Sequence, residues 1–167
     1  RRRFIDMELT QLSPSYCDNL RHYYKVLEQR NTLLKSALDK EEKNRLLQVW
    51  DEQLARYGSF LISSRIEIIK KLQELARGIL RDISNNRENL SVEYFSTIEE
   101  DNSMSGEETF LNHLLSQRSQ DIRYGSTSSG PHRDDIKILV NEKPLKTFGS
   151  QGQQRTVTIA LKLAERE

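Results

Sequence analysis

The residues with the clearest chemical potential lie in the run Phe148-Gly149-Ser150-Gln151-Gly152-Gln153-Gln154-Arg155-Thr156. This Gly-Ser-x-Gly turn leads directly into the apolar segment 157–161, which is typical of a helix. Glycine lets a backbone approach a ligand closely, and the first turn of a helix carries unpaired N–H groups and partial positive charge. The run therefore has the composition of a phosphate-binding turn. An ordinary helix cap is the alternative, with Ser150 as the N-cap and Gln153 as its capping-box partner.

A second glycine-containing segment, from Gly125 to Gly130, matches the first six positions of a P-loop. A P-loop continues with Lys, which reaches the phosphates, and then with Ser or Thr, which holds Mg²⁺. Pro131 and His132 occupy those two positions here, and Pro also lacks an N–H donor. The sequence therefore indicates a flexible linker at this point instead of a P-loop.

Few side chains have the types and spacing of a metal or nucleophile site. His132, Asp134 and Asp135 are metal-ligand types, but the two aspartates would point to opposite faces of the strand that follows. We favour a polar strand start in which Arg133 pairs with a carboxylate. Cys17 is the sole cysteine, so neither a disulfide framework nor a zinc pattern is present.

The composition bounds the class of protein. Of the 167 residues, 35% are hydrophobic and 31% are charged, a balance that favours helices with much solvated surface. The formal net charge is +1, so any contact with nucleic acid must depend on local charge. No apolar run has the length of a membrane span, and we expect a cytoplasmic protein. The first residue is not Met and the last residues continue a helical pattern, which predicts a piece of a longer protein.

Two groups of basic residues could contact DNA phosphates. One group is at the N-terminus and the other is on a predicted long helix; together they comprise Arg1, Arg2, Arg3, Arg65, Lys70 and Lys71. Such groups bind phosphate without reading the base sequence. A solvated chain end and a solvated helix face are the alternatives, and the sequence leaves both open.

Two long helices, over about 14–38 and 42–83, are predicted to form an antiparallel hairpin because only a short connection separates them. Pro14 after Ser13 is a typical helix start. We expect apolar seams at steps of four and three on both helices. On the first helix the seam comprises Leu20, Tyr24, Leu27, Asn31, Leu34 and Leu38. On the second it comprises Leu54, Gly58, Leu61, Arg65, Ile68, Leu72, Leu75 and Ile79.

The remaining segments predict an α+β fold that is mostly α. The expected order is an extended segment at 1–12, the hairpin, a short strand near 90–97, a helix at 107–122, a linker at 124–130, a strand at 136–140 that pairs with 145–148, and a helix from 151. Composition changes at the linker, and we place the domain boundary there.

The run at 148–156 resembles the ABC-type signature motif of the RecF family of recombination mediators, with Ser-Gln-Gly-Gln-Gln in place of Leu-Ser-Gly-Gly-Gln. Three further stretches are similar to the family and occur in family order: Arg2-Arg3-Phe4-Ile5-Asp6, Gln29-Arg30-Asn31-x-Leu33-Leu34-Lys35 and Gly130-Pro131-His132-Arg133-Asp134-Asp135. The resemblance spans nearly the whole chain. It implies an exit from an ATPase head over 1–12, a helical arm over 13–122, and a returning head segment over 123–167.

The resemblance implies a cytoplasmic DNA-repair and replication protein that acts in gap repair, replication restart and the SOS response. Its expected ligands are ATP with Mg²⁺ and DNA at single-strand/double-strand junctions, and its expected partners are RecO, RecR and a second copy of itself. In such heads the signature motif of one subunit faces ATP held by the Walker motifs of the other. Ser150 would bond the γ-phosphate, Gly152 would offer its N–H, and Gln153 and Gln154 would support the ribose or the dimer contact. Gln151 departs from the usual Gly, which leaves the backbone contact there open.

The same resemblance would place the block His132, Arg133, Asp134 and Asp135 near the nucleotide or at a domain interface. The chain shows neither a Walker A lysine motif nor a Walker B strand, so we expect it to be inactive as an ATPase alone. An alternative is that the hairpin serves only as a protein-interaction or spacer module, which docks RecR without touching DNA. A free-standing coiled coil would explain the helices but not residues 130–156.

Overall fold

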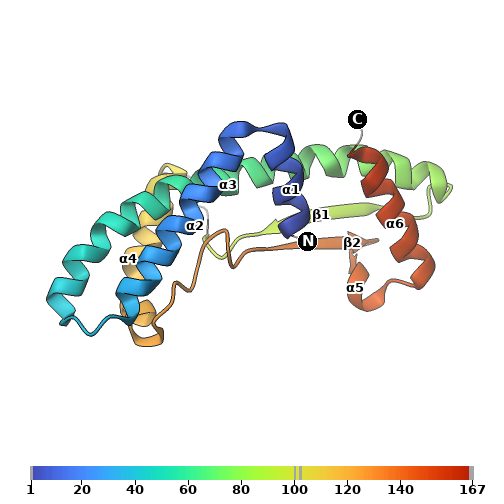
Figure 1. The fold of residues 1–167 in the computed structure, drawn as a ribbon. Coiled ribbons are helices and arrows are strands. Elements are labelled where there is room, and N and C mark those ends of the chain that lie inside the picture. Colours follow the sequence, from blue (N-terminus) through green and yellow to red (C-terminus); the bar gives the residue numbers. More distant parts are fainter. Residues whose placement is uncertain (1, 100, 102, 166–167) are drawn as a thin grey trace. The chain divides into compact units, whose positions relative to one another are not determined.

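The computed structural model describes residues 2–99, 101 and 103–165, which fall into two compact units. Unit 1 comprises Arg2 with residues 65–95 and 135–165, and unit 2 comprises residues 3–64 and 96–134. The long helix α3 (Lys40–Ile83) contributes its first part to unit 2 and its second part to unit 1. Figure 1 labels the helices of both units and the strands β1 and β2. In the part of the chain that is described, no helix is both long enough and apolar enough to cross a membrane.

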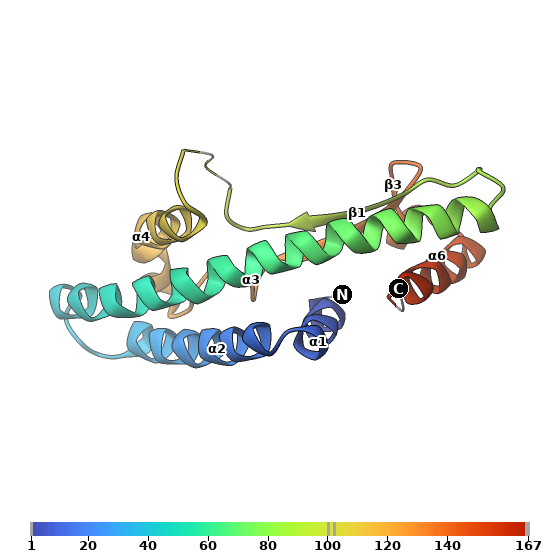
Figure 2. The same ribbon diagram turned by 90° about the horizontal axis from the view of Figure 1, so that it is seen from above.

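Unit 2 is helical and contains the predicted hairpin. Besides the first part of α3, its helices are α1 (Arg2–Leu12), α2 (Pro14–Lys35) and α4 (Gly106–Tyr124). Ser13 caps α2 by accepting from the Tyr16 N–H at 3.2 Å, and Pro14 occupies the first helical position. Asp39 caps α3 by accepting from the N–H groups of the second and third residues that follow it. The chain reverses direction between the end of α2 and the start of α3, so α2 and the first part of α3 lie side by side (Figure 2).

The N-terminal segment is the helix α1, so the extended segment expected there is wrong. Ile5 and Leu9 are buried on one face, at the i, i+4 spacing of a helix. The Tyr16 hydroxyl donates to Asp6 Oδ1 at 2.5 Å, which fixes α1 against the start of α2. Leu12 continues the same spacing, so the apolar pattern fits a helix at least as well as a strand.

The buried face of α2 differs from the expected seam by about one position. Tyr24 is 47% exposed, whereas its neighbour Tyr23 is fully buried. Leu27 and Leu34 are buried as predicted. The complete buried set is Tyr16, Tyr23, Val26, Leu27, Arg30 and Leu34. The predicted seam on this helix omits Arg30, because arginine is almost never fully buried unless it is paired.

The buried row on α3 follows a longer period than the predicted heptad seam. The seam is correct at its first four positions, but Leu75 is 40% exposed. The observed row comprises Leu54, Gly58, Leu61, Arg65, Ile69, Leu72, Ala76 and Leu80. This row fits the 11-residue repeat of a nearly straight helix, so a 7-residue template drifts off it after a few turns.

Unit 1 contains a three-stranded antiparallel sheet in the order β1-β2-β3. The strands are β1 (Leu90–Phe95), β2 (Asp135–Val140) and β3 (Lys143–Pro144). β1 and β2 pair along their full length, with Leu90 opposite Val140 and Phe95 opposite Asp135. The strand near 90–97 is therefore present. Its partner strand follows the linker in the sequence, so the two compact units do not divide the chain at the boundary expected at 122/123.

Side chains of α3 occupy the outer edge of β1. Gln73 Oε1 accepts from the Val92 N–H at 2.7 Å, and Arg77 Nε donates to the Leu90 carbonyl at 3.0 Å. These are backbone groups that point away from β2. Because a strand edge recruits another strand through such unpaired groups, the two side chains block extension of the sheet on this side.

The return strand expected over 145–148 is wrong, because β2 is followed by a tight turn and a one-turn helix. Asn141 and Glu142 form a two-residue turn with φ values of 49° and 65°, as hairpin turns require. β3 ends after two residues, and α5 (Leu145–Phe148) and α6 (Gln151–Ala164) follow. The helix expected from residue 151 is confirmed.

The helix α4 begins with a complete capping box. Ser105 Oγ accepts from the Glu108 N–H at 3.2 Å, and the Glu108 carboxylate accepts from the Ser105 N–H and hydroxyl at 2.9 and 2.8 Å. These bonds, first from the backbone N–H and then from the hydroxyl, hold the pKa of the Glu108 carboxyl below its usual value. Gly125, with φ of 65°, ends the helix. The helix expected over 107–122 is confirmed, with its ends defined by these caps.

Two glycines of α3 provide a matched test of core packing. A Cβ at Gly58 would lie 2.1 Å from Cε1 of the buried Phe110 ring, whereas a Cβ at Gly78 would meet nothing within 4 Å. We expect Gly58→Ala to lower the free energy of unfolding by about 1–3 kcal/mol through overpacking. Gly78→Ala should raise it by up to about 1 kcal/mol through helix propensity. Urea unfolding followed by circular dichroism measures both, and equal effects would contradict the packing of α4 on α3.

Candidate functional site

The predicted phosphate-binding turn forms the first turn of α6. Ser150 is the N-cap, and its Oγ accepts a hydrogen bond from the Gln153 N–H at 3.2 Å. Gln153 Oε1 in turn accepts from the Ser150 N–H at 2.9 Å. The capping-box interpretation is therefore confirmed. The box uses one acceptor position of the Ser150 hydroxyl, and its proton stays available to a further acceptor.

The same turn presents further donors. Gln151 and Gly152 are the first two residues of α6, so helix geometry provides no acceptor for their N–H groups within the helix. The Gln154 N–H bonds to the Ser150 carbonyl at 3.0 Å, and its side-chain amide donates to the Gly149 carbonyl at 3.0 Å. Ser150, Gln151, Gly152 and Gln154 are exposed. The five residues predicted from the sequence thus form an uncharged, donor-rich surface.

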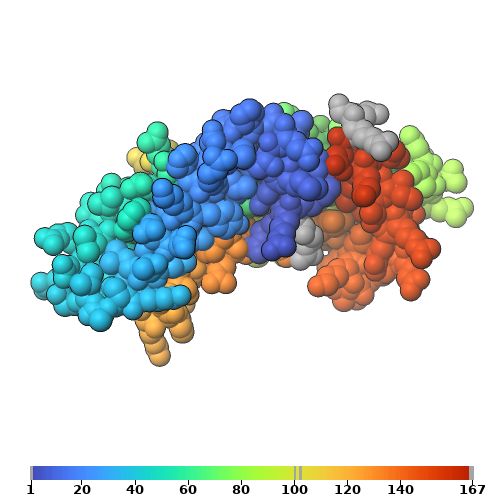
Figure 3. Space-filling view, viewed as in Figure 1, coloured from blue at the N-terminus to red at the C-terminus, as the bar shows by residue number. Residues whose placement is uncertain are grey.

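A shallow, open depression adjoins this turn. Gln151 and Gln154 line it together with Arg155, Thr158 and Ile159. In the space-filling view, α6 (red) lies at the surface of unit 1 (Figure 3), and Ile159 is 52% exposed. The depression therefore combines neutral amide donors with one cation and one apolar side chain.

The block at 132–135 is largely committed to contacts inside unit 2. His132 Nδ1 lies 2.7 Å from Tyr23 Oη, and its Nε2 lies 3.2 Å from the Thr127 carbonyl oxygen. Asp134 is 1% exposed, and its Oδ1 accepts from both the N–H and the hydroxyl of Thr97 at 2.7 Å. Both side chains therefore act as internal braces.

The other two members of the block differ from this pattern. Arg133 is exposed, and its Nε donates to the Thr127 carbonyl at 3.4 Å instead of making the carboxylate pair expected for it. Asp135 begins β2 and belongs to unit 1, whereas Asp134 belongs to unit 2. Across the described ranges, no three or more His, Cys, Asp and Glu side chains are grouped to hold a metal ion.

In the segment from Gly125 to Gly130, which matches the start of a P-loop, backbone N–H groups donate hydrogen bonds to acceptors within the protein. The Thr127 N–H donates to Asn31 Oδ1 at 2.8 Å, and the Ser128 N–H donates to Asp121 Oδ1 at 3.0 Å. The Gly130 N–H donates to Thr97 Oγ1 at 2.8 Å. A phosphate nest needs these donors free, so residues 125–134 are better described as an anchored segment than as a flexible linker.

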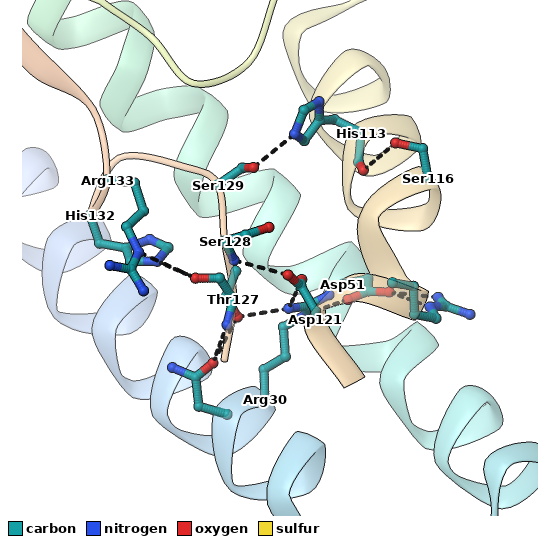
Figure 4. Close-up of polar contacts among 12 residues, drawn as sticks. Arg30, Asp51, His113, Ser116, Asp121, Thr127, Ser128, Ser129, His132 and Arg133 are labelled. Carbon is teal, nitrogen blue, oxygen red and sulfur yellow. Dashed lines mark hydrogen bonds and ion pairs between the residues drawn. The ribbon is translucent and has the colours of Figure 1, made fainter. Parts of the chain in front are cut away.

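A buried arginine fixes this anchored segment to the helices (Figure 4). Arg30 of α2 is fully buried, and its Nε donates to Asp51 Oδ1 of α3 at 2.6 Å. Its Nη1 donates to Asp121 Oδ2 of α4 and to Thr127 Oγ1, both at 2.7 Å. Arg118 of α4 also binds Asp51, from Nη2 to Oδ2 at 2.5 Å. Two cations and two carboxylates therefore neutralise one another among three helices and the anchored segment.

Sequence reasoning did not predict this cluster. In the sequence, Arg30 belongs to a stretch that is notable only for its family resemblance, and no pattern points to Asp51 or Asp121. The available signal was an arginine among apolar positions of an amphipathic helix, three residues after Leu27 and four before Leu34. Nothing in the linear sequence identifies which carboxylates would meet it, because they lie far away along the chain.

The arginines predicted to contact DNA are not all at the surface. Arg1 lies outside the described residues, Arg2 is half-buried and Arg3 is exposed. Arg65 is 1% exposed, and its Nη1 donates to Tyr94 Oη at 3.4 Å. This burial removes Arg65 from any surface that meets a phosphate.

Lys70 and Lys71 are exposed on α3. Lys71 pairs with Glu67 at 2.7 Å, and this hydrogen bond and the charge of the lysine hold the pKa of the Glu67 carboxyl below its usual value. Such an exposed pair is weak, so the lysine can exchange its partner for a phosphate at small cost. These two lysines remain surface candidates.

The helical hairpin and the small sheet with its helix define the class of protein: an α+β fold, mostly α, that matches part of an ABC-type ATPase. The chain is 47% identical over 175 residues to the DNA replication and repair protein RecF of Natranaerobius thermophilus. This alignment covers 100% of this chain and 45% of that protein. It is 44% identical over 166 residues to the RecF protein of Clostridium tetani. The chain belongs to the RecF family, as its motifs predict. A comparison with models of protein families found no match.

Solved structures agree with this assignment. The chain of the recombination mediator protein RecF-ATP in the RecFOR pathway aligns with a TM-score of 0.88 at 34% identity, over 99% of this chain and 44% of that one. The corresponding RecF-ATPrS structure aligns with a TM-score of 0.86 at the same identity. The chain spans a little under half the length of the relatives and structures it matches.

The Arg30 cluster gives a test by substitution. Arg30→Met would leave Asp51 and Asp121 buried without their shared cation, and we expect a loss of about 3–5 kcal/mol in the free energy of unfolding. Arg30→Lys should recover only part of this, because one ammonium cannot reproduce the Nε and Nη1 contacts together. Arg118→Met is the matched control. Its side chain is 17% exposed and Asp51 keeps Arg30, so the loss should be smaller. Chemical unfolding measures these losses. A larger loss of unfolding free energy in Arg118→Met than in Arg30→Met would contradict the central role of Arg30.

Proposed function

We propose that the chain is the arm and signature-bearing part of an ATP-dependent, DNA-binding recombination mediator of the RecF type. In this proposal the first turn of α6 completes an ATP site whose phosphates and Mg²⁺ are held by the Walker motifs of a second subunit. The observation that carries the proposal is the exposed set of donors at Ser150, Gln151 and Gly152. The solved RecF structures with ATP or ATPrS support it by likeness.

The chemistry asked of this turn is positioning and charge stabilisation, as phosphoryl transfer requires. The Ser150 hydroxyl accepts from the Gln153 N–H and would donate its proton to a γ-phosphate oxygen. The N–H groups of Gln151 and Gly152 would point at the same phosphate, and the partial positive charge of the helix N-terminus adds to their effect. Because Gly152 has no side chain, the phosphate can approach the backbone closely. The turn offers no acid or base, so it orders the reactants and moves no proton.

The biological setting belongs to the same proposal. A RecF protein carrying this chain would act in the cytoplasm, in gap repair, replication restart and SOS induction. It would bind single-strand/double-strand junctions in DNA and work with RecO and RecR. The chain alone should lack ATPase activity, since it supplies the signature half of the site without the Walker half.

A charge placed at the helix cap tests the ATP site. In a RecF protein of full length that carries this sequence, Ser150→Arg should weaken ATP-dependent dimerisation by at least about tenfold, because it removes the phosphate-facing hydroxyl and adds bulk. ATP binding to the monomer should not change, since the Walker motifs hold ATP there. Light scattering with and without ATP measures the first, and nucleotide titration the second.

Ser119→Arg is the matched control for that experiment. Ser119 is exposed on α4, so the same substitution there should leave ATP-dependent dimerisation intact. Unchanged dimerisation of Ser150→Arg would contradict the signature role. Loss of ATP binding by the monomer would instead place Ser150 in a site within one subunit.

A second function, docking of a protein partner by the arm, is favoured by the distribution of charge. Residues 88–117 contain seven Asp and Glu and no Lys or Arg, whereas residues 136–164 contain five Lys and Arg and one Glu. A DNA backbone is repelled by the first segment and attracted by the second. In this alternative the acidic loop and α4 meet RecR, and the arm does not contact DNA.

Charge reversal distinguishes the two functions. If the α3 surface contacts DNA, Lys70→Glu with Lys71→Glu should weaken binding and lower the slope of log K against log salt by about two. Lys25→Glu, at an exposed position on α2, is the control and should change neither. Fluorescence anisotropy with a junction DNA over a series of salt concentrations measures both. An unchanged slope together with retained RecR binding would favour the docking function.

A further inference from the structure

The junction between α5 and α6 depends on Gly149, whose two backbone groups bind different helices. Its N–H donates to the Leu145 carbonyl at 2.9 Å, which closes the single turn of α5. Its carbonyl accepts from the side-chain amide of Gln154 at 3.0 Å, which belongs to α6. Gly149 therefore connects the turn before the cap with the first turn after it.

Space, not backbone conformation, requires glycine at this position. Gly149 has φ of −75° and ψ of 132°, which any residue can adopt. A Cβ there would lie 2.5 Å from the Leu145 carbonyl oxygen and 2.6 Å from Leu145 Cδ1. The side chain of Leu145 is buried, and its carbonyl is backbone, so neither obstacle can swing aside.

Leu145 is held in place through the turn that precedes α5. This turn is fixed by three hydrogen bonds of Asn141, which we call the Asn141 clamp. The Asn141 N–H donates to the Asn89 carbonyl at 2.9 Å, and Asn141 Oδ1 accepts from the Asn89 N–H at 2.8 Å. Asn141 Nδ2 also donates to the Arg87 carbonyl at 3.1 Å. The turn after β2 is thereby fixed to the segment before β1, and only the two residues of β3 separate this turn from α5. A side chain at position 149 would consequently displace the cap of α6 more readily than it displaces α5.

Gly152 provides the contrast within the same motif. A Cβ at this position would meet only Ser150 Oγ, at 3.8 Å, which is an ordinary contact. The chain itself therefore has room for a side chain at Gly152 and has none at Gly149. One glycine serves the internal packing of the motif, and the other faces outward.

We propose that Gly149 is a positioning residue for the signature turn: its contact with α5 sets where the Ser150 hydroxyl and the first N–H groups of α6 stand. This inference rests on the proposed ATP function of that turn. It adds that α5 and the hydrogen bonds of Asn141 help to fix the position of the signature turn, in addition to the packing of α6.

The test compares three variants of a RecF protein of full length that carries this sequence. Gly149→Ala should weaken ATP-dependent dimerisation by about tenfold, with ATP binding to the monomer unchanged. It should also speed hydrogen exchange of the backbone N–H of Gln153, which donates to the Ser150 hydroxyl oxygen in the capping box and is protected by this bond. Gly78→Ala is the matched control, since its Cβ meets nothing within 4 Å, and it should change neither readout. Asn141→Gly keeps the positive φ but removes the side-chain clamp, and should act in the same direction as Gly149→Ala with a smaller effect.

The outcomes separate this inference from the proposed function. Normal exchange at Gln153 and normal dimerisation in Gly149→Ala, with dimerisation lost in Ser150→Arg, would overturn the positioning role and leave the ATP function standing. If Ser150→Arg also dimerises normally, the ATP function fails, and the exchange rate alone decides whether Gly149 positions the cap. If Gly149→Ala does not fold, the two readouts in Asn141→Gly decide, and unchanged values there overturn the inference.

Discussion

Burial of Arg30 requires that all of its neighbours be in place together. A guanidinium removed from water is stable only when carboxylates and other acceptors surround it, and here they come from α3, α4 and the anchored segment. Each missing acceptor would leave a charge in a medium that cannot solvate it. Nη2 of Arg30 is buried with no hydrogen-bond partner among the described residues, so the cluster has no spare acceptor. Unit 2 therefore has one arrangement of its helices and anchored segment that satisfies this residue.

This constraint decides what residues 125–134 can do. Thr127 bonds both Arg30 and Asn31, Ser128 bonds Asp121, and the following histidine and aspartate bond Tyr23 and Thr97. A loop of glycine and serine with free N–H groups would suit phosphate, but this one has already used those groups. Of the block that resembles the family, Arg133 is the side chain left at the surface. Up to Asp134 the block is therefore internal structure of unit 2 with one exposed cation, and Asp135 begins β2 of unit 1.

The sequence predicted those features that depend on neighbours along the chain. Ser13-Pro14 and the Ser150–Gln153 pair gave correct helix starts, because caps are made within four residues. Beyond Arg65 the heptad seam is correct only at Leu72, because the buried face of α3 follows an 11-residue repeat. Leu145–Phe148 has the apolar ends of a strand, yet pairing with β2 ends at Pro144 and the Gly149 N–H bonds to the Leu145 carbonyl, which closes a helical turn. The Arg30 cluster could not be predicted at all, since its members are distant in sequence and meet only in the folded unit.

The first turn of α6 differs from the other polar segments in having backbone donors without acceptors in the described part of the chain. The outer edge of β1 is occupied by Gln73 and Arg77, the start of α4 by its capping box, and the glycine-rich segment by acceptors of unit 2. At the start of α6 the capping box satisfies the Gln153 N–H but leaves those of Gln151 and Gly152, together with the hydroxyl proton of Ser150. Water can solvate such donors, and at Gly152 the missing side chain leaves the backbone beside them open, since a Cβ there would meet only Ser150 Oγ at 3.8 Å. The phosphate of the proposed ATP site would use both the free donors and this open stretch of backbone.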